Sequence, residues 1–192
     1  MKKDLLLNKY LPAYDFNEVH SVSIHASPEK VFAAIKNLTP SELSPWVYRL
    51  LSIRELPAKL IGKPFQQTWN GKPFLEQLYE GGFIPLAEEP NQEIVFGMIG
   101  QFWELTGGKS PQITSPQEFL AFDQPDYARV AANLAVIDLE NGTTRCNTET
   151  RIHAINPAAR KKFTFYWRLI SMGSGFIRFL WLNAIKRKAE RG

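Results

Sequence analysis

The 192-residue sequence predicts one α+β domain in which a curved antiparallel sheet of about six to seven strands wraps around a long C-terminal helix. Three observations predict this class. An alternating strand pattern comes first and is followed at once by helical patterns. Strand patterns then fill the middle of the chain. Helical spacing returns over residues 157–190.

The first part of the chain predicts an arm, a strand and two short helices. Residues 1–16 form the N-terminal arm, and apolar and polar residues alternate over 18–26 as in a half-buried strand. Ser27-Pro28-Glu29 then starts a helix, because serine caps the first amides and proline suits the first helical position. Thr39-Pro40 starts a second helix, and Pro57 ends it.

The middle of the chain predicts one short helix and then antiparallel strands. Residues 74–79 have helical spacing and are closed by Gly81-Gly82. Strand patterns follow at 83–88, 93–105, 118–122, 127–140 and 143–155. Asn141-Gly142 predicts a two-residue hairpin between the last two strands, because both residues tolerate positive φ.

Residues 157–190 predict the long helix that the sheet would wrap. Pro157 opens it, and apolar residues recur at helical spacing on both sides of a glycine-containing stretch. Because Gly173 and Gly175 weaken a helix, we expect a kink or short break near 171–175, where Ser174 could cap the second half.

The cysteine content and the lengths of the apolar runs indicate the cellular compartment. The single cysteine, Cys146, leaves no internal disulfide and fits a reducing cytoplasm. The apolar run at residues 5–7 is shorter than the roughly 7–15 residues of a signal-peptide core. No stretch approaches the roughly 20 apolar residues of a membrane-spanning helix. We therefore expect a soluble cytoplasmic protein without a transmembrane segment.

The net charge of +4 is concentrated near the C-terminus. One basic cluster lies at 160–162 and another at 186–191, in the last turns of the predicted helix, where cations complement the helix dipole. We interpret both clusters as solvated helix surface and expect no nucleic-acid partner. The alternative is a patch that binds nucleic acid or an anionic membrane surface. No feature of the sequence predicts an oligomeric state.

Several stretches of the sequence resemble a known family. They lie at 22–32, 96–103, 148–152, 166–170, 173–175 and 181–187. Together they resemble the bacterial SRPBCC group, the START-like or Bet v 1-like helix-grip proteins that are often labelled polyketide cyclase/dehydrase-related. The resemblance spans nearly the whole chain. It implies an apolar cavity, but members of this group include carriers, receptors and cyclases, so it does not settle the activity.

The sequence contains no motif that we can assign to catalysis or metal binding, and we expect no cofactor and no metal. His20 and His25 lie five residues apart on one predicted strand and therefore point to opposite faces. No Cys/His/Asp cluster has zinc spacing. Gly173-Ser174-Gly175 lacks the spacing of a nucleophile elbow or a dinucleotide-binding loop.

The candidate site is a pocket between the sheet and the C-terminal helix. Aromatic residues of the long strand are expected to face those of the helix, where core and pocket wall are one surface. The expected lining residues are Phe96, Met98, Phe102, Trp46, Tyr166, Trp167, Asn133, Glu149 and Arg151. The charged pair on the last strand is ambiguous: it forms a solvent-exposed ladder if its face is outward, and a buried pair that orients a ligand if its face is inward.

Three functions are consistent with these features. The first is binding of a hydrophobic small molecule or lipid, without catalysis. The second is a cyclase, aromatase or dehydratase that shapes a flexible substrate, with Glu149, His20 or Tyr166 as acid or base. The third is a membrane-surface or protein-interaction role through the basic C-terminus.

Overall fold

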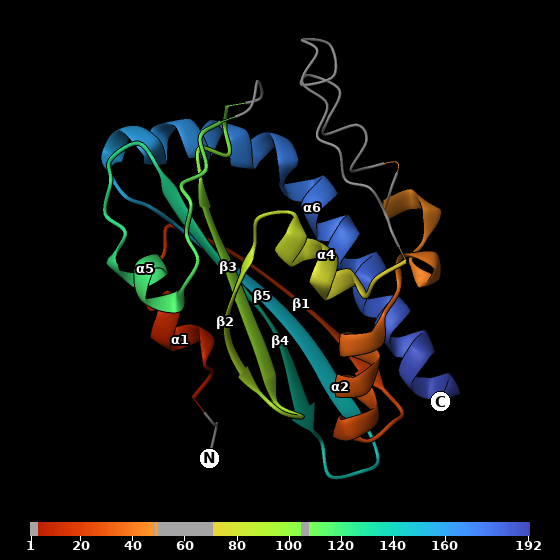
Figure 1. Cartoon of the computed structure of the whole chain (residues 1–192). Coiled ribbons are helices and arrows are strands. Elements are labelled where there is room, and N and C mark those ends of the chain that lie inside the picture. The colour runs from red at the N-terminus through yellow and green to blue at the C-terminus, as the bar shows by residue number, and fades with distance from the viewer. Residues whose placement is uncertain (1–3, 48, 50–70, 105–107) are drawn as a thin grey trace.

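The computed structural model describes residues 4–47, 49, 71–104 and 108–192 and centres on a five-stranded antiparallel sheet. The strand order is β1-β5-β4-β3-β2, with β1 (Phe16–Ile24), β2 (Ile84–Glu89), β3 (Glu93–Gly100), β4 (Ala128–Asp138) and β5 (Thr144–Ala154). The helices are α1 (Leu7–Tyr10), α2 (Pro28–Asn37), η1 (Pro40–Glu42), α4 (Phe74–Glu80), α5 (Pro116–Ala121) and α6 (Pro157–Arg191). Figure 1 shows the curved sheet with α6 running along it. The α+β class is confirmed, and the sheet has five strands instead of six to seven.

The missing strand is residues 118–122, which lie in helix α5 and just after it. Ser115 Oγ accepts a hydrogen bond from the N–H of Glu118, and Pro116 occupies the start of the helix. These are the capping features that begin helices, and they outweigh the apolar run that suggested a strand. The helix buries Phe119 completely.

The ends of two other elements also differ from expectation. β3 stops at Gly100 instead of continuing to residue 105. The loop between β4 and β5 spans 139–143, because Asp138 pairs with Thr144. Its positive φ values fall at Glu140 and Gly142, so the two-residue hairpin at 141–142 is wrong. Of the second expected helix, residues 40–42 form η1 and 45–47 are helical, and the part from 50 to Pro57 lies outside the described residues.

The long helix is present and has no break. α6 continues through 171–175, and Figure 1 shows its axis changing direction between its two halves. Asn156 caps the helix by accepting a hydrogen bond from the N–H of Ala159. Ser174 does not act as a cap and instead accepts a hydrogen bond from Arg178.

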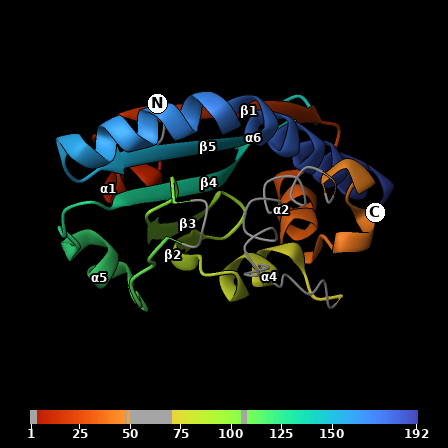
Figure 2. The ribbon, with the colours of Figure 1, turned by 90° about the horizontal axis from the view of Figure 1, so that it is seen from above.

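Helices cover both faces of the sheet. Helices α2, α4 and α6 pack on one face, which we call the inner face. The C-terminal half of α6 packs there beside α2 and α4, and its N-terminal half packs farther along the same face. α1 and α5 pack on the opposite, outer face. Figure 2 shows α2 and α4 beside the C-terminal end of α6, and α1 and α5 toward its other end. None of the helices in the described part of the chain combines the length and apolar character of a membrane-spanning segment.

Candidate functional site

The inner face changes from apolar to polar across the sheet. Strand pairing aligns Phe96 of β3 with Ala132 of β4, Thr150 of β5 and Glu18 of β1 in one row. Residues paired directly across neighbouring strands share a face, and Glu18, Thr150 and Phe96 each contact a residue of α6, so this row points toward α6. The β3 end of the row is aromatic, its centre is small, and its β1 end carries a carboxylate.

A group of hydrogen-bonded polar side chains occupies the β1 end of this row. The Arg178 guanidinium of α6 donates to Glu18 Oε2 at 3.1 Å and to Thr150 Oγ1 at 2.7 Å. It also donates to Ser174 Oγ at 2.6 Å, and Glu18 Oε1 lies 2.7 Å from His20 Nε2. Burial lowers the pKa of Arg178, and the Glu18 carboxylate partly offsets this effect. The group is therefore a paired, largely buried cation and anion.

Gly175 allows α6 to approach this polar group closely. A Cβ at position 175 would lie 2.5 Å from Glu18 Oε1 and 3.3 Å from His20 Cε1. Gly173, in contrast, has no heavy atom within 4 Å of such a Cβ. The glycine-containing stretch thus provides room for Glu18 at one position only.

Aromatic rings form the β3 end of the inner face. The Phe96 ring contacts Phe83 at 5.6 Å and Trp181 of α6 at 6.4 Å between centroids, and Trp181 meets Phe74 of α4 at 4.9 Å. Among the described residues, the buried Trp181 Nε1 and the buried Gln77 Oε1 of α4 have no hydrogen-bond partner. One donor and one acceptor therefore remain unsatisfied on helices that pack in and beside this cluster.

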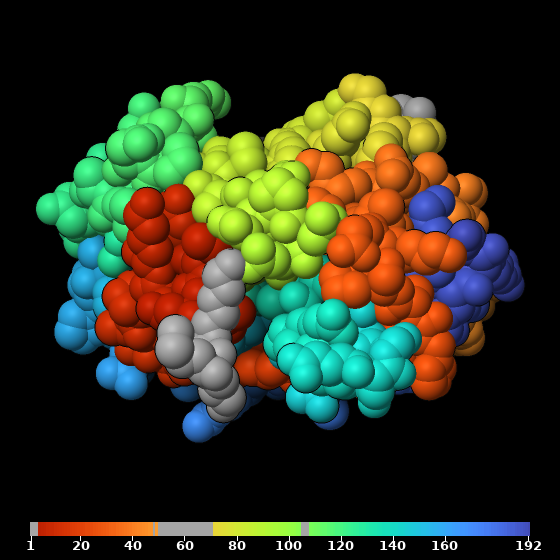
Figure 3. Space-filling model, turned by 90° about the horizontal axis from the view of Figure 1, so that it is seen from below, coloured from red at the N-terminus to blue at the C-terminus, as the bar shows by residue number. Residues whose placement is uncertain are grey.

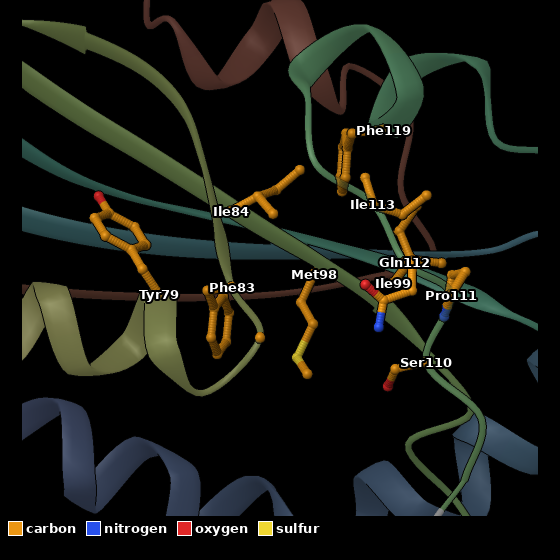
Figure 4. A pocket seen from close by; sticks show the side chains of 11 residues that line it. Tyr79, Phe83, Ile84, Met98, Ile99, Ser110, Pro111, Gln112, Ile113 and Phe119 are labelled. Atoms are coloured by element: carbon orange, nitrogen blue, oxygen red, sulfur yellow. The ribbon is translucent and has the colours of Figure 1, made fainter.

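A cavity of about 230 Å³ lies next to this aromatic cluster, at the edge of β3. It exists because β2 begins at Ile84, opposite Gly97, so that Met98 and Ile99 extend past the end of β2. Figure 4 shows Met98 between the Phe83 side and the segment that carries Ile113. In Figure 3 the molecule is hollowed between the yellow region around α4 and the green region around α5.

Most side chains that line this cavity are apolar, and polar atoms make up about half of its exposed wall. Tyr79, Phe83, Ile84, Met98, Ile113 and Phe119 supply the apolar surface, and Ser110 and Gln112 add polar groups. Burial raises the pKa of the Tyr79 phenol, and the Glu88 carboxylate adds to this effect, so the phenol stays neutral. Since Phe83 also touches Phe96, the cavity adjoins the inner face.

The residues predicted to line one pocket lie in separate parts of the structure. Phe96 lies in the aromatic cluster with Trp181, and Met98 lines the cavity. Phe102, Tyr166 and Trp167 instead surround Phe163 near the start of α6, at centroid distances of 6.3, 5.7 and 5.9 Å. Trp46 is 55% exposed, and the Arg49 guanidinium lies 5.0 Å from its ring centroid.

The remaining three expected residues lie on the outer face. Asn133 Nδ2 donates to Glu93 Oε1 at 2.7 Å, and Asn133 Oδ1 accepts from the N–H of Glu149 at 2.8 Å. Arg151 Nε donates to Glu149 Oε1 at 2.7 Å. The charged face of β5 therefore points neither to solvent nor to α6.

The N-terminal segment covers these outer-face groups. Arg151 Nη1 donates to Asn8 Oδ1 at 2.7 Å and to the Leu11 carbonyl at 3.1 Å. The Glu93 carboxylate accepts from the N–H groups of Leu6 and Leu7 at 2.6 and 3.3 Å. Figure 3 shows this red segment lying against the neighbouring green elements. The buried charges on this face hold the arm in place.

The three side chains considered for acid–base chemistry are not brought together. Glu149 is on the outer face, His20 is paired with Glu18, and Tyr166 is buried among aromatic rings. Among the described residues, no group of three or more His, Cys, Asp and Glu side chains could hold a metal ion.

Sequence reasoning missed the polar group around Arg178. A single arginine in a long helix is usually exposed. The available signal was its position three residues after Gly175, since both residues lie on the same side of the helix as Trp181 and Leu182.

Comparison with known proteins gives no family. No model of a protein family matches the chain, and no curated protein matches it. Among solved structures, the chain is similar to the crystal structure of the hypothetical protein jhp0584 from Helicobacter pylori. The two share 11% identity with a TM-score of 0.42, over 98% of this chain and 97% of that one.

Proposed function

We propose that the chain binds a small, mainly apolar molecule in the cavity beside β3, with part of the molecule reaching the inner face. The cavity itself carries this proposal: most side chains that line it are apolar, it adjoins an aromatic cluster, and its wall also offers polar atoms. Ligand sites usually measure about 300–1,000 Å³. A cavity of about 230 Å³ suits a ring system or a short acyl segment.

The unsatisfied polar atoms give the ligand a second property. Trp181 Nε1 can donate one hydrogen bond and Gln77 Oε1 can accept one. Both residues lie outside the cavity lining, so we propose that the ligand is amphipathic and that a polar group on the part that reaches the inner face pairs with one of these atoms. We also propose that the chain is a member of the SRPBCC group with a reduced sheet. The order of strand, short helices, antiparallel strands and long helix supports this membership.

The test compares two tryptophan substitutions of isoleucine. Ile113→Trp places a larger ring in the cavity wall, whereas Ile137→Trp makes the same change at an exposed position near the end of β4. Native mass spectrometry of each protein, compared with its denatured mass, detects a co-purified molecule. Titration with an environment-sensitive naphthalene sulfonate dye measures occupancy.

We expect the wild type and Ile137→Trp to behave alike and Ile113→Trp to lose at least about tenfold in dye affinity, because the added ring occupies the binding volume. The same variant should lose any co-purified mass. Equal binding by all three proteins would remove the cavity from consideration. Unfolding of Ile113→Trp is checked by circular dichroism, and Ile84→Phe provides a smaller change in the same wall.

One observation supports the cyclase-like alternative. Glu18 Oε1 lies 2.7 Å from His20 Nε2, which is the arrangement that orients an imidazole as a base. The proposed test is incubation with a synthetic linear poly-β-ketone and detection of ring products by mass spectrometry. Product formation that is lost in His20→Gln would establish this function, and its absence with the wild type would exclude it for that substrate class.

A further inference from the structure

The outward side of α6 carries a continuous apolar stripe. Phe165, Leu169, Met172, Phe176 and Phe179 are 78, 68, 84, 45 and 56% exposed. They are spaced alternately four and three residues apart, so they form one line along the helix. At 1.5 Å rise per residue the line is about 21 Å long. We call these five residues the α6 stripe.

The α6 stripe is distinct from the core of the protein. The buried residues of the same helix, including Phe163, Tyr166 and Trp181, face the sheet. Single exposed apolar residues are common on protein surfaces, whereas a contiguous row of large ones marks an interaction site. The other large exposed apolar residues of the described chain are Tyr14, Val19, Trp46, Leu120 and Ile137, which lie on separate elements.

The charge around the stripe has one sign. α6 contains nine Lys and Arg residues and one acidic residue, Glu190 in its last turn. Lys161 and Arg168 are exposed on the same side as the stripe, at helical spacing from Phe165 and Met172. Arg187 is exposed farther toward the C-terminus, whereas Lys186 pairs with Glu190 at 2.7 Å and donates to the Ser23 carbonyl of β1. The surface is therefore an apolar line with cations at its ends and margin.

Acidic groups pair with other cations of α6, including Lys186 with Glu190 and Lys188 with Glu42, and leave Lys161 and Arg168 unpaired in the described part of the chain. Asp15 pairs with Arg160, Asp126 with Lys162, and Glu18 with the inward-pointing Arg178. Within the described residues, Lys161 and Arg168 have no acidic partner within ion-pair distance. Both cations remain available to a negatively charged surface.

We propose that the α6 stripe docks on an anionic lipid bilayer, with its side chains at the boundary of headgroups and acyl chains. A helix with Phe, Leu and Met on one side and Lys and Arg beside them has the pattern of an interfacial helix. Figure 2 shows α6 curving along the sheet. The exposed stripe lies on the side of α6 that faces away from the sheet, where it can meet a flat surface.

A second copy of the chain fits this surface less well. Pairing two copies through α6 would bring two strongly basic helices together, and like charges at close range disfavour association. An anionic bilayer supplies the opposite charge along the whole stripe and accepts side chains without requiring a complementary groove. The proposal does not depend on ligand binding in the cavity.

The test measures co-sedimentation of the full chain with vesicles. One set contains phosphatidylcholine alone and another contains about 30% phosphatidylglycerol, at about 0.1 M and about 0.5 M salt. The variants are Met172→Glu and Leu169→Glu in the stripe, and Lys161→Gln with Arg168→Gln at its margin. Val19→Glu is the control, because it adds the same charge at a position that is 55% exposed on another element.

We expect binding to anionic vesicles that weakens at high salt and is weak on neutral vesicles. Each stripe variant should bind at least about tenfold more weakly, and each lost cation should lower binding about fivefold. Val19→Glu should bind like the wild type. The stripe residues are exposed, so these variants should keep the wild-type circular dichroism spectrum.

Two results would overturn the proposal. One is equal sedimentation of the wild type and Met172→Glu with anionic vesicles. The other is absence of vesicle binding together with a dimer, measured by analytical ultracentrifugation, that Met172→Glu dissociates. The second result would assign the α6 stripe to self-association.

Discussion

Replacing Arg178 tests whether its ion pair holds α6 against β1. The Arg178 and Glu18 side chains are only 16 and 17% exposed, and the guanidinium also donates to Thr150 and Ser174. In Arg178→Met the Glu18 carboxylate keeps its burial and loses its cation. Breaking a buried pair on one side typically costs about 3–5 kcal/mol. Because both groups keep some contact with solvent, we expect the lower end, about 3 kcal/mol.

The double variant separates the charge effect from packing. In Arg178→Met with Glu18→Gln both charges are gone, and the glutamine can still pair with His20. We expect this protein to recover most of the loss, because a buried ion pair and a well-packed neutral pair have similar stability. The coupling free energy between positions 18 and 178 should then be at least about 2 kcal/mol.

Urea unfolding followed by tryptophan fluorescence measures these free energies. A loss of about 3 kcal/mol corresponds to a fall of roughly 6–12 °C in melting temperature for a chain of this size. Arg168→Met is the matched control on the same helix, since Arg168 is exposed, and its change should stay within about 0.5 kcal/mol. If Arg178→Met matched this control, or if the double variant were no more stable than the single one, the ion pair would not hold α6 in place.

Three further predictions follow from other contacts. Gly173→Ala should raise the melting temperature by about 2–4 °C, because alanine has the higher helix propensity. Gly175→Ala should not raise it, because the added Cβ meets Glu18. Equal gains for the two variants in calorimetry would contradict the close approach of α6 to Glu18. Arg151→Met should release the N-terminal segment, which amide hydrogen exchange would detect as faster exchange at residues 6–11. Unchanged exchange would show that apolar packing alone holds this segment. Burial raises the pKa of the Cys146 thiol to about 12, so a disulfide reagent at pH 8 should react only after urea unfolding, and rapid reaction of the folded protein would contradict its burial.

The sequence predicted elements well where local signals were strong. Ser27-Pro28 marks the start of α2, and Pro157 marks the first residue of α6. The apolar pair Phe119 and Leu120 predicts a strand at 118–122, but Ser115 and Glu118 form a capping pattern that begins a helix there. At this position local capping chemistry outweighs the apolar run.

The candidate site was harder to predict because it depends on where α6 crosses the sheet. Aromatic residues were expected on the inner face, but the helix position that meets Phe96 is Trp181 instead of Tyr166. No periodicity specifies this crossing, because it follows from the curvature of the sheet and helix. The orientation of β5 was undetermined for a related reason: its charged face is covered by Asn8 and Leu11, more than a hundred residues earlier.

The fastening of the N-terminal segment has a consequence for the order of folding. Among the described strands β1 pairs with β5 alone, and the α1 region is held by Glu93 and Arg151. The α1 region and β1 leave the ribosome long before Glu93, Arg151 and β5 are synthesised. They can therefore pack only after the β2–β5 meander has been made and has assembled. The earliest-made part of this domain is therefore among the last to be fixed, and during synthesis its apolar run at residues 5–7 is exposed to chaperones.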